Sequence, residues 1–264
     1  MVTVGQSGVR GWVKRLRLGM AVARPRRYVF LLSHMRSYSS LLAHIMNSNR
    51  EISGYVEVHQ SYQSQFDLLD LQFKVADMTG GKLRGAYVLD KILHNHRQVS
   101  PEILTRDDVY AIFFIRDPEQ TIKSMIAMFK GKPQAWMPEG PATYYVRRLE
   151  HLAMMATKKP NKSLFFEADL IVEDTSSVLA SVDRFLSLKH PLQSEYDLFD
   201  LTGRPRFGDP GRFISSGHIV HERRDYSQIE LPEEDLLRAK EAFERCREIL
   251  TERCEIVVGA RKES

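Results

Sequence analysis

Cysteine is scarce in this chain of 264 residues, and long apolar runs are absent. The only two cysteines, Cys246 and Cys254, do not form a CxxC pair. This argues against a disulfide scaffold and favours reduced thiols in a cytoplasmic protein. No stretch of 18 apolar residues occurs, so no membrane-spanning helix is predicted. The basic N-terminus lacks the apolar segment of a secretory signal.

Acidic residues are missing from the first fifty positions. Residues 1–50 contain nine Lys or Arg, and Glu51 is the first acid. The rest of the chain carries 29 basic and 34 acidic residues, a net charge of −5. Positive charge therefore gathers in a basic arm, residues 1–26, and in the stretch after it, which suits a polyanionic nucleotide. For the arm alone, contact with nucleic acid or with an anionic membrane surface stays open.

Glycine is absent from the stretch Tyr28–Met46, around which the rest of the chain is organised. Its first five residues, Tyr28–Leu32, predict a buried strand, and the apolar spacing of residues 41–46 predicts an amphipathic helix. A polar turn rich in serine joins them. Such a turn directs free backbone N–H groups and the positive helix end at one place, which predicts an anion site. Without glycine the turn is not a Walker A loop.

A second apolar run, Tyr110–Ile115, predicts another buried strand. Arg116, Asp117 and Pro118 follow it, and Pro118 suits the first position of a helix. Ser124 lies on that helix, eight residues after Arg116. A hydroxyl at this position could also bond back to the helix backbone.

These two stretches together resemble the nucleotide-binding motifs of sulfotransferases that use 3′-phosphoadenosine 5′-phosphosulfate (PAPS). Residues 35–42, Met-Arg-Ser-Tyr-Ser-Ser-Leu-Leu, are similar to that family's 5′-phosphosulfate loop, with Met35 replacing its proline and Tyr38 its glycine. The family places an Arg after its fourth core strand and a Ser eight residues later, and both bind the 3′-phosphate. Arg116 and Ser124 have this spacing. The resemblance covers residues 28–129.

Alternating strands and helices predict a single α/β domain at residues 27–264, with a parallel, doubly wound sheet and a P-loop-like strand-turn-helix. Strands are expected at Tyr28–Leu32, Ile52–Val58, Ala86–Asp90, Val109–Ile115 and Ser163–Glu167. Helices are expected at residues 41–46, Tyr62–Met78, Pro118–Phe129, Ala142–Thr157, Thr175–Leu186 and Pro232–Arg253. Residues 130–141 and 189–230 are expected to form loops.

The resemblance also implies roles for the polar residues of these motifs. Arg36 stands where cytosolic members usually have Lys, and it would stabilise charge on the leaving group. The 5′-phosphate would be surrounded by Ser37, Tyr38, Ser39, Ser40 and Leu41. The serines could also cap the helix, and the two roles can coexist. Arg212, in the glycine-rich segment 207–217, is the candidate for a loop over the 3′-phosphate, with Arg223 and Arg224 as alternatives.

Two residues are candidates for the base that takes the acceptor's proton. His94 follows the third expected strand and lies 22 residues before Arg116, close to the place of the base in many cytosolic members. Glu57, beside His59, follows the second expected strand, where other branches of the family have a glutamate. We favour His94 by a small margin.

The resemblance implies a transferase that moves the sulfuryl group of PAPS to a hydroxyl or an amine. The transferred group carries less charge than a phosphoryl group, so no metal is expected. The acceptor would be a small molecule, a carbohydrate or a lipid, not a nucleic acid. Two alternatives stay open: a nucleotide or sugar kinase of related fold, and a non-catalytic nucleotide- or glycan-binding module.

Overall fold

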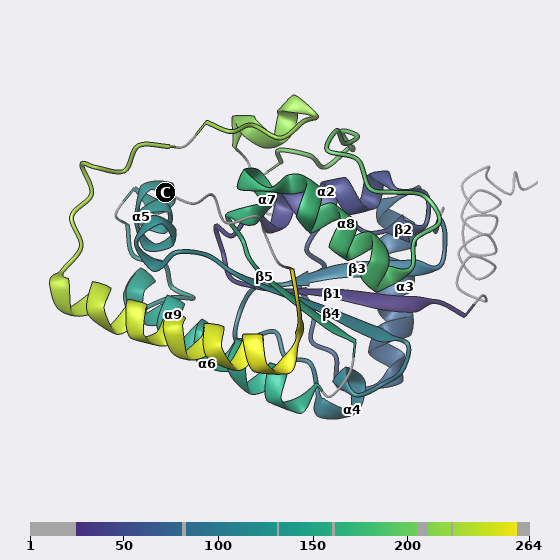
Figure 1. Cartoon of the computed structure of the whole chain (residues 1–264), viewed down its shortest axis with the longest axis horizontal. Coiled ribbons are helices and arrows are strands. Elements are labelled where there is room, and N and C mark those ends of the chain that lie inside the picture. The colour runs from purple at the N-terminus through teal and green to yellow at the C-terminus, as the bar shows by residue number, and fades with distance from the viewer. Residues whose placement is uncertain are drawn as a thin grey trace, which may run out of the picture.

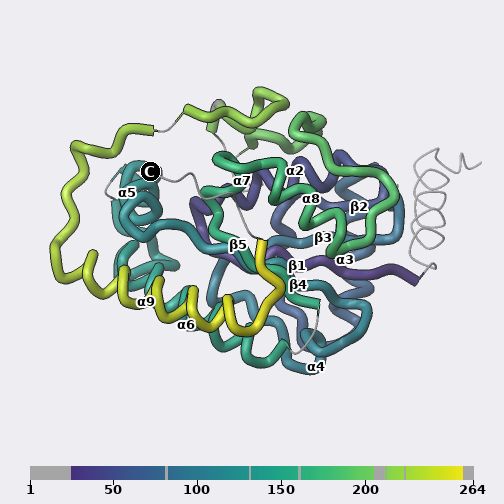
Figure 2. The backbone as a smooth tube through the Cα atoms, in the orientation of Figure 1, coloured from purple at the N-terminus to yellow at the C-terminus, as the bar shows by residue number. Residues whose placement is uncertain are grey.

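The computed structural model describes residues 25–80, 83–130, 132–159, 162–204, 211–222 and 224–257. Nearly all of the basic arm, residues 1–24, therefore lies outside the described part. The described residues form an α/β domain in which one sheet runs through the middle and helices cover both of its faces (Figures 1 and 2).

Among the described residues, six strands form a sheet in the order β2-β3-β1-β4-β5-β6, and every neighbouring pair is parallel. Their bounds are β1 (Arg27–Leu32), β2 (Ile52–Ser53), β3 (Tyr87–Ile92), β4 (Val109–Ile115), β5 (Ser163–Glu167) and β6 (Glu255–Ile256). The two apolar runs that dominate the sequence, β1 and β4, pair side by side near the middle. The expected parallel, doubly wound fold is confirmed.

The side chains of β1 alternate between two cores, because successive residues of a strand point to opposite faces. Phe30 and Leu32 pack on one face, and Val29 and Leu31 pack on the other. The first face carries α3 (Gln65–Met78), α4 (Pro101–Leu104), α5 (Pro118–Phe129), α6 (Gly140–Lys158) and α9 (Glu233–Arg253). The second carries α2 (Ser39–Ser48), α7 (Leu170–Glu173) and α8 (Thr175–Leu186). Within the described ranges, no helix is long and apolar enough to span a membrane.

The second strand is shorter than expected, because it ends at Ser53 and not near Val58. Gly54 has a φ of 120°, and its backbone N–H donates to the side-chain oxygen of Asn47 at 2.6 Å. A Cβ at Gly54 would collide with the carbonyl oxygen of Leu89. The chain therefore turns away from β3 at a point that only glycine fits.

The helix expected from Tyr62 begins three residues later, at Gln65. Ser64 and Asp67 form a capping box there, so the N-terminus is set by a local polar signal. Tyr62 is fully buried instead, and its hydroxyl donates to Asp90 at 2.6 Å. The short elements α4, α7 and β6 were not expected, because segments of two to four residues carry little periodicity.

Candidate functional site

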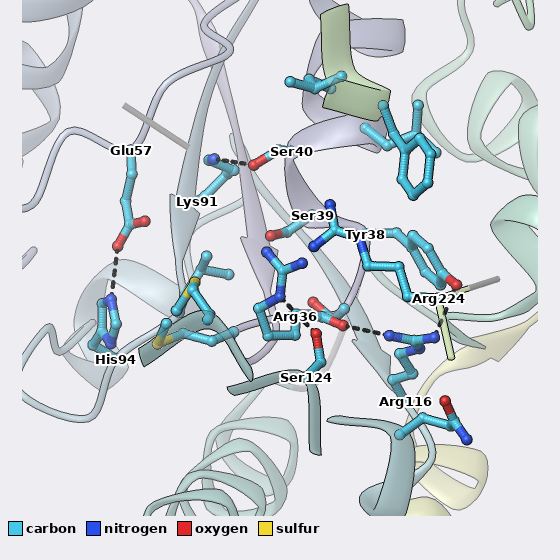
Figure 3. A pocket seen from close by; sticks show the side chains of 18 of the residues that line it. Arg36, Tyr38, Ser39, Ser40, Glu57, Lys91, His94, Arg116, Ser124 and Arg224 are labelled. Atoms are coloured by element: carbon cyan, nitrogen blue, oxygen red, sulfur yellow. Dashed lines mark hydrogen bonds and ion pairs between the residues drawn. The ribbon is translucent and has the colours of Figure 1, made fainter. Parts of the chain in front are cut away.

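The polar turns after β1, β3 and β4 meet at the carboxyl edge of the sheet, where parallel strands commonly place their ligand sites. They surround a cavity of about 700 Å³ (Figure 3). Its lining includes four cations, Arg36, Lys91, Arg116 and Arg224. Two carboxylates, Glu57 and Glu222, also line it. The described part of the site therefore has an excess of positive charge, as an anionic ligand requires.

The turn after β1 is built with two residues in the left-handed backbone region, Arg36 at φ 63° and Tyr38 at φ 61°. Tyr38 is the N-cap of α2, and its side chain makes no capping hydrogen bond. The N-cap residue is therefore not one of the serines. The first N–H groups of a helix lack intrahelical acceptors. Those of Ser39, Ser40 and Leu41 are thus at the helix end that borders the cavity.

His34 ties this turn to the end of β4. Its Nε2 accepts the backbone N–H of Arg116 at 3.0 Å, and its Nδ1 lies 2.8 Å from the carbonyl oxygen of Met35. Burial lowers the pKa of His34 to about 3, so the ring is neutral and can play both roles. The hydroxyl of Ser37 donates to the carbonyl oxygen of His34 at 2.7 Å and thus serves the turn itself.

The two motifs recognised in the sequence come together in space. Arg36 Nε donates to the hydroxyl of Ser124 at 2.9 Å, although the residues lie 88 positions apart. The hydroxyl of Tyr226 also donates to that of Ser124, at 2.9 Å. Arg116 Nε is 3.1 Å from a carboxylate oxygen of Asp169, and Arg116 Nη1 is 3.1 Å from the carbonyl oxygen of Arg36.

Lys91 is a site residue that the sequence reasoning did not single out. Its side chain is 1% exposed, and its ammonium donates to the hydroxyl of Ser40 at 3.2 Å. A lysine is almost never fully buried without a partner. The usable signal was a lysine near the end of a buried strand, paired in register with Leu31, the second-last residue of β1.

Both candidate bases lie at the same end of the cavity. Glu57 Oε1 is 3.5 Å from Nε2 of His94 and 3.4 Å from Nδ1 of His59. Figure 3 shows Glu57 and His94 facing each other at one end of the cavity, with Arg116 at the other. His94 Nδ1 lies 2.7 Å from the hydroxyl of Tyr144, which fixes the ring.

The pKa shifts leave both groups able to accept a proton at neutral pH. Burial lowers the pKa of His94 to about 4. Burial alone would raise the pKa of Glu57, but contacts with His59, Lys91 and His94 outweigh it and hold the pKa below its usual value. No hydrogen-bond donor in the described part of the chain reaches the buried Oε1 of Glu57.

Asp90 holds the segment that carries Glu57. Its carboxylate accepts the backbone N–H of Val58 at 2.9 Å and the hydroxyl of Tyr62 at 2.6 Å. Burial raises the pKa of Asp90 to about 6. Because Asp90 and Lys91 are neighbours on β3, one strand positions both Glu57 and the buried ammonium.

The remaining candidates come from the segment that follows α8. Arg212 begins a 3₁₀ helix, Arg212–Ser216, but its side chain lies outside the described part, as does Arg223. Arg224 lines the cavity, and its guanidinium lies 5.1 Å from the ring centre of Phe213. No cluster of three or more His, Cys, Asp or Glu able to hold a metal occurs among the described residues.

The fold is similar to that of a sulfotransferase domain from the curacin biosynthetic pathway, with a TM-score of 0.55. The two chains are 16% identical, and the match covers 84% of this chain and 98% of that one. No protein-family model matches the sequence, and no curated protein matches it significantly. At this identity the likeness shows the α/β fold, and the function has to be argued from the site.

Proposed function

We propose that the protein is a PAPS-dependent sulfotransferase. The observation that carries the proposal is the meeting of Arg36, Lys91, Arg116 and Ser124 with the N-terminus of α2 around one cavity. A volume of about 700 Å³ lies in the usual range for small-molecule sites. The cations and the first N–H groups of α2 fit a nucleotide that carries phosphates at both ends of its ribose.

The donor end of the cavity is assigned from the two motifs. The N–H groups at the start of α2 and the hydroxyls of Ser39 and Ser40 would hold the 5′-phosphate. Arg116 and Ser124 would hold the 3′-phosphate. PAPS supplies the activated sulfuryl group, and the residues supply orientation and positive charge.

Charge on the departing nucleotide would be met by Arg36 and Lys91. Both side chains line the cavity, and each bonds a hydroxyl of the nucleotide-binding motifs, Ser124 and Ser40 respectively. A guanidinium keeps its proton, so Arg36 stabilises charge without transferring a proton. Such fixed charges act most strongly where water is excluded.

The acceptor's proton would pass to Glu57 and His94. Because both are deprotonated at neutral pH and lie together at one end of the cavity, that end is where the acceptor's hydroxyl or amine would enter. Phe129 and Trp136 border the same part of the site, Trp136 with its ring 5.2 Å from that of His94.

The donor assignment can be tested by calorimetry with 3′-phosphoadenosine 5′-phosphate, the spent donor. Arg116→Ala should weaken binding by about 1.5–3 kcal/mol, the usual size of a charge-assisted hydrogen bond. Arg106→Ala is the matched control, because Arg106 pairs with Asp108 before β4 and does not line the cavity. Unchanged affinity in a folded Arg116→Ala protein would contradict the assignment.

The reaction class is tested by turnover of PAPS with a panel of acceptors after treatment with EDTA. We expect activity to survive, because the donor's charge is met by side chains and backbone amides. Complete loss that Mg²⁺ restores would favour the kinase alternative. Tight nucleotide binding without turnover of any acceptor would favour the non-catalytic module.

A further inference from the structure

Tyr38 occupies a backbone conformation in which a tyrosine is uncommon. Its φ of 61° and ψ of 15° lie in the left-handed region, which glycine enters without steric cost. Residues held there cluster at functional sites, where other contacts compensate the strain. Glycine would suit this backbone conformation better, so the presence of a tyrosine has to be explained by the contacts of its side chain.

The side chain of Tyr38 lies against Arg116. The centre of the guanidinium is 4.4 Å from the centre of the phenol ring, and the Tyr38 hydroxyl accepts a hydrogen bond from Nη2 at 2.9 Å. A cation over an aromatic face and a hydrogen bond to the hydroxyl of the same ring are two attractive contacts with one partner. Figure 3 shows the Tyr38 hydroxyl and Arg116 side by side at one end of the cavity.

The other contacts of Arg116 complete this arrangement. Nε binds Asp169 and Nη1 binds the carbonyl oxygen of Arg36, each at 3.1 Å. With Nη2 on Tyr38, three of the five N–H groups of a guanidinium are engaged. Within the described ranges, two N–H groups are left for a ligand. The three contacts fix the orientation of the guanidinium plane that carries them.

We infer that the side chain of Tyr38 is a positioning element for Arg116 and thereby determines how strongly the protein prefers nucleotides with a 3′-phosphate. The inference rests on the proposed function, which assigns the 3′-phosphate to Arg116 and Ser124. It adds a role for the tyrosine ring and hydroxyl, where the resemblance implied only that Tyr38 lies beside the 5′-phosphate. Pre-set groups bind more tightly because less freedom is lost on binding.

The test compares two ligands, 3′-phosphoadenosine 5′-phosphate and adenosine 5′-phosphate, by calorimetry. The measured quantity is the dissociation constant of adenosine 5′-phosphate divided by that of 3′-phosphoadenosine 5′-phosphate. This ratio requires neither an acceptor nor turnover. In Tyr38→Phe this ratio should fall about 5–10-fold, because one hydrogen bond to a charged group is lost while the ring remains. In Tyr38→Gly it should fall further, because the ring is lost as well.

Tyr38→Gly also guards against misfolding, because glycine accepts the backbone conformation of residue 38 without strain. Tyr28→Phe is the matched control: the buried hydroxyl of Tyr28 is 2.6 Å from Gln72 on α3, outside the cavity lining. We expect Tyr28→Phe to keep the wild-type ratio. A changed ratio in this control would mean that any buried tyrosine affects the site, and it would overturn the inference.

The remaining outcomes separate the inference from the proposed function. If the wild-type protein binds both nucleotides equally, the assignment of the 3′-phosphate fails and the inference fails with it. If the wild type prefers the nucleotide with the 3′-phosphate and both Tyr38 variants keep the wild-type ratio of dissociation constants, the proposed function stands and the role of Tyr38 is refuted. Equal weakening of both ligands would likewise refute it, because a merely structural residue has that effect.

Discussion

Glu57 and His94 are alternatives in the sequence and neighbours in the structure, 3.5 Å apart. The Tyr144 hydroxyl lies 3.0 Å from the carbonyl oxygen of Leu93 and 2.7 Å from His94 Nδ1. If Tyr144 donates to Leu93, His94 must donate from Nδ1, which leaves a lone pair on Nε2 facing Glu57. Two proton acceptors then face each other, and we expect the pair to act as a unit.

A double-mutant cycle tests this pairing. Glu57→Gln and His94→Ala should each lower turnover about 10²–10⁴-fold, the usual contribution of a general base. The turnover of the double variant should be only slightly lower than that of the less active single variant, because the effects of residues that act as a unit are strongly non-additive. His96→Ala is the control: the His96 ring stacks on that of His94 with 5.2 Å between their centres, but among the described residues no ion pair joins His96 to Glu57. Losses that multiply would show independent roles.

The same pKa values predict the pH dependence of turnover. His94, with a pKa of about 4, and Glu57, with a pKa below its usual value, are both deprotonated above about pH 5. A base works in its deprotonated form, so the rate should be level between pH 5 and 8 and should fall only below that window. A decline centred near the ordinary histidine value of about 6.5 would contradict the buried pair.

At the scale of elements, the link between β2 and α3 places Glu57 in the cavity. It leaves the sheet at Gly54, is held by Asp90 through Val58 and Tyr62, and enters α3 at a capping box. The position of Glu57 therefore depends on a turn that is several residues away from it.

Gly54→Ala should lower the free energy of unfolding by at least about 3 kcal/mol, because the new Cβ meets the Leu89 backbone at a φ of 120°. Gly80→Ala is the control: its φ is 69°, but apart from its chain neighbours no described residue has an atom within 4 Å of its added Cβ. We expect that variant to lose about 1–2 kcal/mol from backbone strain alone. Urea denaturation of both measures the difference, and equal losses would show that the collision at Gly54 is relieved by local movement.

At the scale of the whole molecule, the buried carboxyl of Asp90 links stability to pH. Its pKa is raised from 3.8 to about 6, so the folded protein binds this proton more tightly than the unfolded chain. That contribution is present at low pH and is lost as the pH rises from 4 to 6.

The lost contribution can be isolated with Asp90→Asn. At about 1.4 kcal/mol per unit, the shift from 3.8 to about 6 corresponds to roughly 3 kcal/mol. The stability of the wild type relative to Asp90→Asn should therefore fall by about this amount between pH 4 and pH 7, as measured by denaturant unfolding. Parallel stability curves for the two proteins would mean that Asp90 titrates normally.

Much of the fold follows from local sequence, and so do the parts of the site that come after β1 and β4. The runs Tyr28–Leu32 and Tyr110–Ile115 are apolar throughout, which is typical of a strand that is buried on both faces. The turn after β1 and the spacing from Arg116 to Ser124 are likewise encoded by neighbours in the chain. Sequence alone thus determined the α/β class, the polar turn between β1 and α2, and the placement of Arg116 and Ser124 on adjoining elements.

Tertiary structure decided which of these groups meet. Lys91 joins Ser40, and Glu57 joins His94, only because the sheet order sets β3 between β2 and β1. Tyr38 reaches Arg116 because β1 and β4 pair directly, which brings together residues 78 positions apart. Strand order reflects the packing of helices on both faces, which depends on many weak long-range contacts. The apolar periodicity of a strand or helix extends over only two to four residues, so it cannot predict those contacts.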